Sequence, residues 1–317
     1  MNKSILLTGA SGFVGRQLSA SMIKQNVNLT YAVRVPFALE GASRMMLISD
    51  IDEQTDWSRC LTGVEVVVHA AARVHIMNDA SLDPLAEFRK LNVDGTLNLA
   101  RQAVSAGVGR FVFVSSVKVN GEETTSKPFT AFDAPAPLDP YAQSKLEAEI
   151  ALMELSRITG LEVVIIRPPL VYGPGVRANF LKLMQLVKIG VPLPLGAIHN
   201  HRSMVALDNL VDLLITCTHH PAAAGQTFMV SDDNDVSISE LVRMLATAMG
   251  KRPLLLPVPS SIISGAASLF GKSAVASRLL GSLQVDITHT KSTLGWKPVV
   301  SMQDAVNKTV AHFLTNQ

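Results

Sequence analysis

Two side chains that can move a proton and stabilise charge occur four residues apart in the segment YAQSK. Tyr141 and Lys145 stand at positions i and i+4, which places them one turn apart on the same face of a helix. A lysine cation beside a phenol favours the phenolate, so this spacing predicts a lowered pKa for Tyr141 and a role in acid–base chemistry. Taken alone, the same spacing also suits the surface of an ordinary amphipathic helix.

A pair of hydroxyls ends a strongly apolar run upstream of the tyrosine. The segment FVFVSS predicts a strand with Ser115 and Ser116 at its carboxyl end, where doubly wound sheets bind their ligands. A serine hydroxyl at this place can hydrogen-bond a substrate oxygen. Serine, tyrosine and lysine in this order predict a catalytic group, whereas the serine pair alone would indicate only a strand end.

A glycine-rich turn lies near the start of the chain. Gly9, Gly12 and Gly15 form the pattern G-x-x-G-x-x-G, directly after the first predicted strand and before a helix. The early glycines permit a tight turn, so that backbone N–H groups and the helix N-terminus face a pyrophosphate. Gly15 permits close packing of helix on strand. Because the triplet lies at the first strand–helix junction, it favours a dinucleotide site over an ordinary turn.

The elements that must position these groups alternate along the first half of the chain. Strands are predicted at residues 4–9, 29–34, 64–71, 110–116 and 161–168, and helical spacing lies between them, as at residues 85–107 and 141–160. Nearly continuous apolar strands suit a parallel sheet that is covered on both faces. The sequence therefore predicts an α/β fold with a doubly wound parallel sheet of the Rossmann type.

Proline and glycine punctuate the chain after Pro168, and strands become sparse. We expect residues 1–168 to form the dinucleotide-binding domain, with a return segment near residues 203–232. Residues 169–317 are expected to form mainly a smaller, mixed α/β substrate lobe. The least polar stretch, residues 260–283, is broken by Gly, Ser, Lys and Arg. We interpret it as a buried lid or packing helix, with peripheral membrane contact as the alternative.

Composition narrows the class of protein. The 317 residues are 48% hydrophobic and 17% charged, which excludes a disordered chain. A net charge of +2 without a dense Lys/Arg run gives no support for a nucleic-acid partner. Cys60 and Cys217 form no CxxC pair, and His199 and His201 lack the further ligands of a metal site. Without a signal peptide or an apolar run of about 18 residues, we expect a cytoplasmic protein with no integral membrane segment.

Together these motifs resemble the extended short-chain dehydrogenase/reductase family, in the branch that acts on nucleotide sugars. The resemblance covers nearly the whole chain, from TGASGFVG to TLGWKP, and includes HAAA, KLNVDGT, RPPLVYGPG and RSMVALDNLVD. These motifs are highly specific for the superfamily and much less specific for the substrate. The resemblance implies an enzyme with a UDP-sugar substrate and, by analogy with relatives, a homodimer.

The resemblance also implies roles for matching positions. Tyr141 would donate or accept the proton, Lys145 would hold the nicotinamide ribose and tune Tyr141, and Ser116 would hydrogen-bond the reacting oxygen. The other cofactor contacts it implies are Gly9, Gly12, Phe13, Val14, Gly15, Arg34, Asp50, Ile51, Ala70, Ala71, Asn92 and Pro168, with Asp50 and Ile51 flanking the adenine. The substrate diphosphate contacts it implies are Asn179, Arg202 and, more weakly, Arg278. A surface salt bridge is the alternative for Arg202.

Departures from the family's patterns bear on the reaction. Nucleotide-sugar 4,6-dehydratases carry an acidic pair after the catalytic hydroxyl residue, and here Val117 and Lys118 stand at these positions, so dehydration is not expected. The 4-epimerases usually carry an acid for the adenosine ribose at the end of the second strand, where this chain has Arg34. A guanidinium suits a 2′-phosphate, which favours NADPH while NAD(H) stays open. Stacking of Arg34 on the adenine is the alternative. Leu170 stands near the place of an asparagine that is frequent in epimerases.

These departures predict a carbonyl reductase. The expected reaction is NAD(P)H-dependent reduction of the 4-keto group of a UDP-linked 6-deoxy-N-acetylhexosamine. Its product would be UDP-N-acetylquinovosamine for surface polysaccharide such as O-antigen. The alternative is a 4-epimerase of UDP-glucose or UDP-N-acetylglucosamine with bound NAD. A sterol- or flavonoid-type reductase ranks third. A non-catalytic cofactor sensor is disfavoured, because Ser116, Tyr141 and Lys145 are all present.

Overall fold

A computed structural model of the chain describes residues 3–39, 41, 43–74, 83–269, 271 and 273–316. A parallel seven-stranded sheet lies at its centre, in the order β3-β2-β1-β4-β5-β6-β9. Its strands are β1 (Ser4–Thr8), β2 (Asn28–Val33), β3 (Ser43–Leu47), β4 (Val66–His69), β5 (Arg110–Val114), β6 (Glu162–Arg167) and β9 (Thr227–Met229). A separate parallel pair is formed by β7 (Leu170–Tyr172) and β8 (Met204–Ala206).

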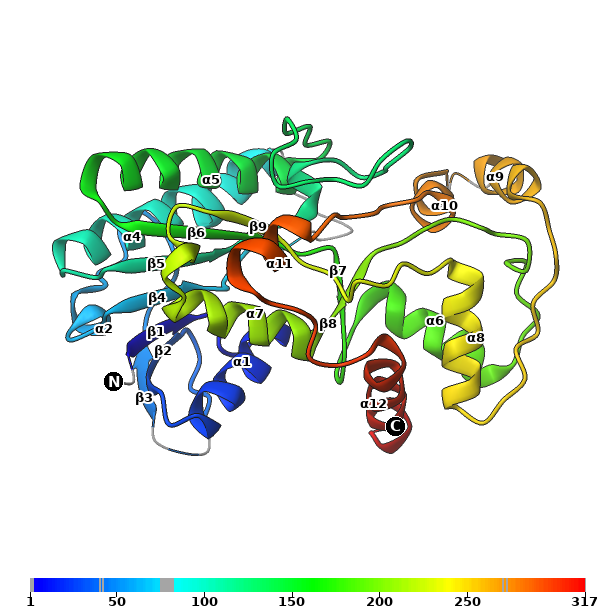
Figure 1. The fold of residues 1–317 in the computed structure, drawn as a ribbon, viewed down its shortest axis with the longest axis horizontal. Helices are drawn as coiled ribbons and strands as arrows, with labels where there is room; N and C mark the ends of the chain where they lie inside the picture. The colour runs from blue at the N-terminus through cyan, green and yellow to red at the C-terminus, as the bar shows by residue number, and fades with distance from the viewer. Residues whose placement is uncertain are drawn as a thin grey trace.

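Helices cover both faces of the large sheet, as Figure 1 shows. One face packs on α1 (Phe13–Lys24) and α7 (Leu207–His219), and the other on α2 (Ser58–Leu61), α4 (Thr96–Ser105) and α5 (Pro140–Thr159). The apolar strands are buried from both sides because each face meets a layer of helices; every residue of β4 is buried. The predicted doubly wound α/β sheet is confirmed.

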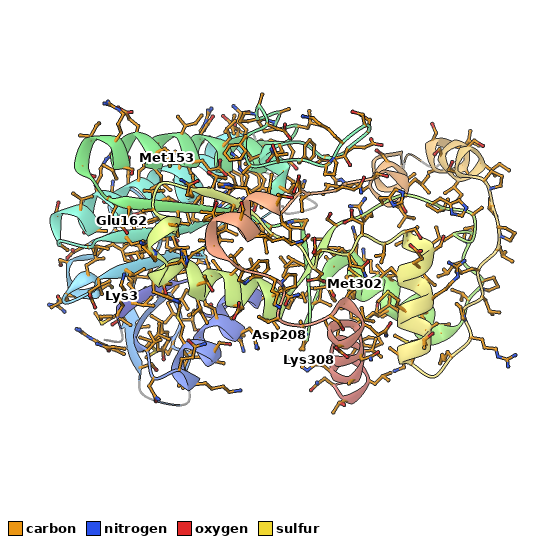
Figure 2. The ribbon with its side chains drawn as sticks, viewed as in Figure 1. Lys3, Met153, Glu162, Asp208, Met302 and Lys308 are labelled. Carbon is orange, nitrogen blue, oxygen red and sulfur yellow. The ribbon has the colours of Figure 1, made fainter. Side chains whose placement is uncertain are left out.

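A second core lies beyond the carboxyl end of β6, on the right in Figure 1. It is built mainly by α6 (Ala178–Ile189), α8 (Ile238–Ala248) and α12 (Met302–Thr315). The remaining helices of this half are α9 (Ser260–Leu269) and α10 (Ser273–Leu280), whereas η3 (Pro221–Ala223) and α11 (Thr288–Leu294) pack against the core of the large sheet. The chain returns to the large sheet through β9, which pairs with β6. Lys308 on α12 and Asp208 on α7, labelled in Figure 2, form an ion pair of 2.7 Å that joins the two halves.

The helix expected at residues 85–107 is interrupted. It consists of α3 (Pro84–Arg89), a π-helical turn η1 (Lys90–Gly95) and α4. At Gly95 a Cβ atom would stand 2.6 Å from the carbonyl oxygen of Ile51, so this turn presses on the segment after β3. A π turn accommodates one extra residue within the helix, and such turns are frequent at functional sites.

The expectation of a buried lid at residues 260–283 is wrong for its first part. None of the described residues of α9 is buried, whereas Ala276 and Leu283 further along are. Most apolar side chains of α9 therefore face solvent, and Ile263 packs against the second core while only partly buried. Among the described residues, the helices lack the combined length and apolar character needed to cross a bilayer.

Candidate active site and cofactor groove

The glycine turn forms a narrow cradle between β1 and α1. Gly9 has a φ of +76°, and a Cβ atom there would lie 2.7 Å from the backbone nitrogen of Ala71. A Cβ atom on Gly15 would lie 2.0 Å from the carbonyl oxygen of Gly9, so only glycine fits. Gly12 is the N-cap of α1, and its own N–H donates to the Gly9 carbonyl at 2.9 Å. Backbone thus lies open where a dinucleotide pyrophosphate would bind, with helix N–H groups facing it.

The groove beside the glycine turn is lined by residues from three further places in the chain. Phe13 and Val14 open α1, and Phe13 packs against the cores of both halves. Ala70 and Ala71 follow β4 and are half-buried against Gly9. These residues fit the place the family resemblance gives them, because backbone from β1, β4 and α1 converges there.

Asn92, in the π turn, holds the segment after β4 in place. Its side chain accepts from the Arg73 N–H at 2.9 Å and donates to the Arg73 carbonyl at 3.1 Å. It also donates to Ser144 Oγ at 3.0 Å, and Ser144 in turn donates to the Tyr141 carbonyl at 2.8 Å. Asn92 therefore links the wall of the cofactor groove to the helix that carries Tyr141.

Arg34 and Asp50 meet at the edge of the groove. The strand register pairs Val33 with Leu47, and the chains beyond bring Arg34 Nη1 to 3.2 Å from Asp50 Oδ1. Asp50 Oδ1 also accepts the N–H of Ile51 at 2.8 Å, while the Ile51 side chain is buried. Both charged side chains are more than half exposed, 60% and 53%. The cation predicted to receive a 2′-phosphate is thus already beside a carboxylate.

Ser116 and Tyr141 come together at the carboxyl end of β5. Ser116 caps η2 (Val117–Val119), accepts the Lys118 N–H at 3.2 Å, and hydrogen-bonds the Tyr141 side chain. Burial, reinforced by the Asp139 carboxylate, raises the pKa of Tyr141 to about 12, although the Ser116 hydrogen bond opposes this. The lowered pKa expected from the tyrosine–lysine spacing is wrong for the protein alone, because loss of solvation and the Asp139 carboxylate together outweigh the Ser116 hydrogen bond.

Lys145 lies one turn along the same face of α5 and is fully buried. Its Nζ stands 3.8 Å from the centre of the Phe113 ring. Burial lowers the pKa of Lys145 to about 7, and the Glu149 carboxylate opposes the shift only in part. The ammonium is therefore held at a substantial desolvation cost, which makes Lys145 a candidate for a functional residue.

A chain of alternating charges leads from the N-terminus of α5 to the second half of the molecule. Asp139 caps α5 by accepting the Ala142 N–H at 2.7 Å. Lys118 Nζ lies 2.5 Å from Asp139 Oδ2 and 2.8 Å from Glu122 Oε1. Arg278, on α10, lies 3.6 Å from Glu122 Oε2. In the sequence, Lys118 was notable only because dehydratases carry an acid at this position. In the structure its side chain pairs with Asp139, the N-cap of the helix that carries Tyr141.

A buried ion pair fixes the end of β6. Arg167 makes three contacts of 2.5–3.2 Å with the carboxylate of Glu149 and donates to Asn120 Oδ1 at 3.0 Å. The next residue, Pro168, is buried and its carbonyl accepts the Val117 N–H at 3.0 Å. These bonds hold the end of β6 against the turn that follows Ser116. Pro168 takes part through its carbonyl, which accepts the N–H of Val117.

The three residues expected to contact a substrate diphosphate are spread over different elements. Asn179 is exposed in the first turn of α6. Arg202 donates to the carbonyls of Arg278 and Gly281 at 2.7 and 3.0 Å, and so caps the end of α10 in place of a surface salt bridge. Burial lowers the pKa of Arg202, an effect that Glu123 opposes. Arg202 and Arg278 thus meet, whereas no contact of the described residues joins Asn179 to them.

Three further features bear on catalysis or metal binding. His69 is buried and its ring nitrogens bond Thr8 Oγ1 at 2.7 Å and Thr96 Oγ1 at 3.0 Å, and burial lowers its pKa to about 3, which fits packing and not catalysis. Ser115 Oγ is buried and makes no hydrogen bond within the described residues. Within the same residues no group of three His, Cys, Asp or Glu side chains could hold a metal ion.

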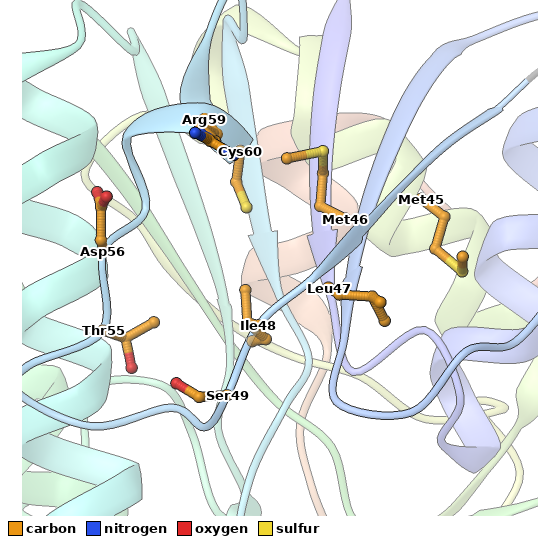
Figure 3. Close-up of a pocket in the computed structure, with 9 residues that line it drawn as sticks. All are labelled: Met45, Met46, Leu47, Ile48, Ser49, Thr55, Asp56, Arg59 and Cys60. Carbon is orange, nitrogen blue, oxygen red and sulfur yellow. The ribbon is translucent and has the colours of Figure 1, made fainter.

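A pocket of about 500 Å³ lies apart from the serine and tyrosine, beside the edge strand β3 (Figure 3). It is lined by Met45, Met46, Leu47, Ile48, Ser49, Thr55, Asp56, Arg59 and Cys60. No residue predicted for the cofactor or the substrate lines it. It is therefore not the candidate active site.

A doubly wound sheet with a glycine cradle and a Ser–Tyr–Lys group defines a dinucleotide-dependent oxidoreductase of the short-chain type. Residues 5–231 match the family described as NAD dependent epimerase/dehydratase family. A UDP-glucose 4-epimerase of Vibrio cholerae is 50% identical over 318 residues, which span 99% of this chain and 96% of that protein. The chain belongs to the NAD-dependent epimerase/dehydratase family.

Solved structures agree on the fold. MoeE5 in complex with UDP-glucose and NAD superposes with a TM-score of 0.79 at 24% identity, covering 98% of this chain and 99% of that one. A UDP-glucose 4-epimerase of Thermotoga maritima with UDP-glucose gives a TM-score of 0.79 at 23% identity, with the same coverage. In the present chain, the open backbone at Gly9, Gly12 and Gly15 leaves room for a dinucleotide pyrophosphate.

Proposed function

We propose that the protein is a UDP-sugar 4-epimerase that works with bound NAD and inverts C4 of UDP-glucose or UDP-N-acetylglucosamine. One observation carries the proposal. Ser116 hydrogen-bonds Tyr141, and Lys145 lies one turn along the same helix, in a chain that is 50% identical along its length to a UDP-glucose 4-epimerase. This favours the alternative of the sequence analysis over the 4-ketoreductase.

The site's own residues would handle the proton on the sugar's 4-oxygen. When bound, NAD would take a hydride from C4 and return it to the other face of the 4-keto sugar. Ser116 would hydrogen-bond the 4-oxygen, and Tyr141 would take its proton and give it back. With a pKa of about 12, Tyr141 is protonated in the protein alone, so it is set up as the donor. The oxidising half needs the phenolate, which Lys145 would favour from the same helix face.

The ion pair at the groove edge supports NAD over NADPH. A 2′-phosphate beside Arg34 would also meet the carboxylate of Asp50, 3.2 Å from the guanidinium, and like charges repel. A 2′-hydroxyl could instead donate to that carboxylate. Asp50 would then serve as the acid that the tip of β2 lacks.

Release of the cofactor tests the proposal directly. Protein purified without added dinucleotide is denatured, and the supernatant is separated and identified by mass. We expect close to one NAD per chain, and conversion of UDP-glucose to UDP-galactose, or of UDP-N-acetylglucosamine to its C4 epimer, with no added cofactor. Tyr141→Phe should lose the conversion and keep the NAD. An active protein that holds no dinucleotide would contradict the proposal.

Reduction of a UDP-linked 4-keto-6-deoxy sugar with NADPH is the second candidate. It rests on Arg34 and on Leu170, the residue near the asparagine position of epimerases. The same preparation separates the two functions, because a reductase would oxidise added NADPH when given the 4-keto sugar. Arg34→Ala should then raise the KM for NADPH and leave that for NADH unchanged.

We also propose that the protein forms a homodimer through α4 and α5, as in relatives. Ile150 and Ile158 on α5 are 62% and 65% exposed, which is costly for isoleucine unless another surface covers it. Sedimentation velocity should show a dimer, and Ile150→Glu combined with Ile158→Glu should give a monomer. A monomeric wild-type protein at micromolar concentration would contradict this assembly.

A further inference from the structure

The outer side of the substrate lobe presents large apolar side chains to solvent. They come from the end of α6, from the segment after α8 and from α9, and we call them the apolar edge: Leu186, Ile189, Leu254, Leu256, Ile262 and Leu269. Figure 1 shows the segment after α8 running along the outside of this lobe to α9. Ile189 is 72% and Leu269 is 87% exposed. Exposed apolar patches of this kind mark contact surfaces.

Backbone hydrogen bonds join two of the segments that carry the apolar edge. The Leu193 N–H donates to the Leu254 carbonyl, and the Leu256 N–H donates to the Leu193 carbonyl, each at 2.8 Å. The Gly196 N–H donates to the Leu256 carbonyl, also at 2.8 Å. The chain after α6 therefore lies alongside the segment that leads into α9. A helix as short as α9 is marginal in water when it buries none of its described residues, so a further surface would stabilise it.

Two stretches of this lobe are strongly cationic, whereas its carboxylates, such as Glu240 on α8 and Asp304 on α12, lie outside them. Residues 169–207 and 241–285 contain nine lysines and arginines and no aspartate or glutamate. The whole chain has 28 basic and 26 acidic residues, so the remainder carries 19 basic against 26 acidic. The lobe segments are thus +9 and the rest of the chain is −7, an asymmetry hidden by the net charge of +2.

Part of this charge lies beside the apolar edge and away from the candidate diphosphate contacts. The Lys251 ammonium donates to the Lys188 carbonyl near the end of α6, and Arg252 is exposed next to it. Asn179 lies in the first turn of α6, nine residues before Lys188, which is about 14 Å along the helix. A substrate diphosphate near Asn179 would therefore not account for Lys251 and Arg252.

We propose that the apolar edge and its cations dock on the surface of an anionic phospholipid bilayer. Leucine and isoleucine side chains would enter the headgroup boundary, while Lys251 and Arg252 would pair with lipid phosphates. The negative remainder of the chain would be repelled, which orients the nucleotide-binding half away from the bilayer. Charge complementarity selects this partner, because the lobe segments carry no carboxylate that an anionic surface would repel. The proposal does not depend on which C4 reaction the site performs.

Vesicle sedimentation with the full-length protein tests the proposal. We expect the protein to pellet with vesicles of phosphatidylcholine and phosphatidylglycerol, and at least tenfold less with phosphatidylcholine alone. Binding should fall at high salt, where counter-ions screen surface charge. Ile262→Glu with Leu269→Glu, and separately Lys251→Glu with Arg252→Glu, should each abolish pelleting.

Matched changes on β3 and α1 control for general effects of added charge. Leu47→Glu replaces an exposed apolar residue, and Lys24→Glu with Arg44→Glu replaces two exposed cations, all far from the apolar edge. These variants should pellet like the wild type. Failure of the wild type to pellet, or equal loss in the control variants, would overturn the proposal. If Ile262→Glu with Leu269→Glu instead converted a dimer to a monomer without lipid, the apolar edge would be a contact between copies.

Discussion

The buried ammonium of Lys145 should make stability depend on pH in an unusual direction. Burial lowers the pKa of Lys145 from 10.5 to about 7 in the folded protein. Between these values the unfolded chain binds more protons than the folded one, so the free energy of unfolding rises with pH. At high pH the buried Lys145 is neutral in the folded protein and carries no desolvation penalty. As pH falls toward 7 the folded protein must bury a charged ammonium, and the free energy of unfolding decreases.

The size of the effect follows from the two pKa values. For a single group with these values, linkage gives about 2 kcal/mol of added stability between pH 7 and pH 9. Lys145→Met removes the titrating group and keeps a side chain of similar length. All other groups are shared by the two proteins, so the difference between their unfolding free energies isolates this one.

Urea unfolding of the dinucleotide-free protein at pH 7, 8 and 9 measures the difference. The wild type should gain about 2 kcal/mol relative to Lys145→Met over this range, while the variant loses activity. Lys24→Met, at an exposed position, serves as the control and should parallel the wild type. A wild-type-minus-variant difference that is flat with pH, or that falls as pH rises, would refute the desolvation argument.

Three further substitutions probe the cradle, the buried ion pair and the charge chain. Gly15→Ala places a Cβ atom 2.0 Å from the carbonyl oxygen of Gly9. It should lower the free energy of unfolding by about 1–3 kcal/mol or more, measured by thermal melting, and should abolish retention of NAD, measured as released dinucleotide. Glu149→Gln leaves a buried guanidinium without its carboxylate and should cost about 3–5 kcal/mol in urea unfolding; a change below 1 kcal/mol would contradict the buried pair. Lys118→Met leaves Asp139 without its lysine partner, so the pKa of Tyr141 should rise and the acidic limb of the pH–rate profile should move to higher pH. Lys118→Arg should restore that limb, and an unmoved limb in Lys118→Met would contradict the coupling.

The central sheet could be predicted because its signals are local. Runs such as those of β4 and β5 are apolar at all but one residue each, and helix α5 begins at Pro140 after its Asp139 cap and ends at Thr159, before Gly160 in the left-handed conformation. The edge strand β3 was missed because SRMML is short and mostly exposed, which removes the apolar pattern. The π turn at Lys90–Gly95 was not predicted, because the helical spacing of residues 85–107 was interpreted as one continuous helix.

The sequence predicted which side chains form the candidate site, but it did not predict their burial or their pKa values. The spacing of Tyr141 and Lys145 indicated their common helix face, and the structure places them so. It could not indicate that both are desolvated, since burial depends on β4, β5 and α3 packing around them. The raised pKa of Tyr141 and the lowered pKa of Lys145 both follow from that burial.

Arg34 shows why charge logic at a single position is incomplete. A cation at the tip of β2 indicates a phosphate ligand only if no carboxylate of the protein already neutralises it. The carboxylate that does so, Asp50, is 16 residues away, and it reaches Arg34 because β3 lies parallel to β2 at the sheet edge. That strand was itself absent from the predicted set, so the pairing had no basis in the sequence. Once the pair is known, the groove edge presents a carboxylate acceptor together with a cation, an arrangement that favours a ribose hydroxyl over a phosphate.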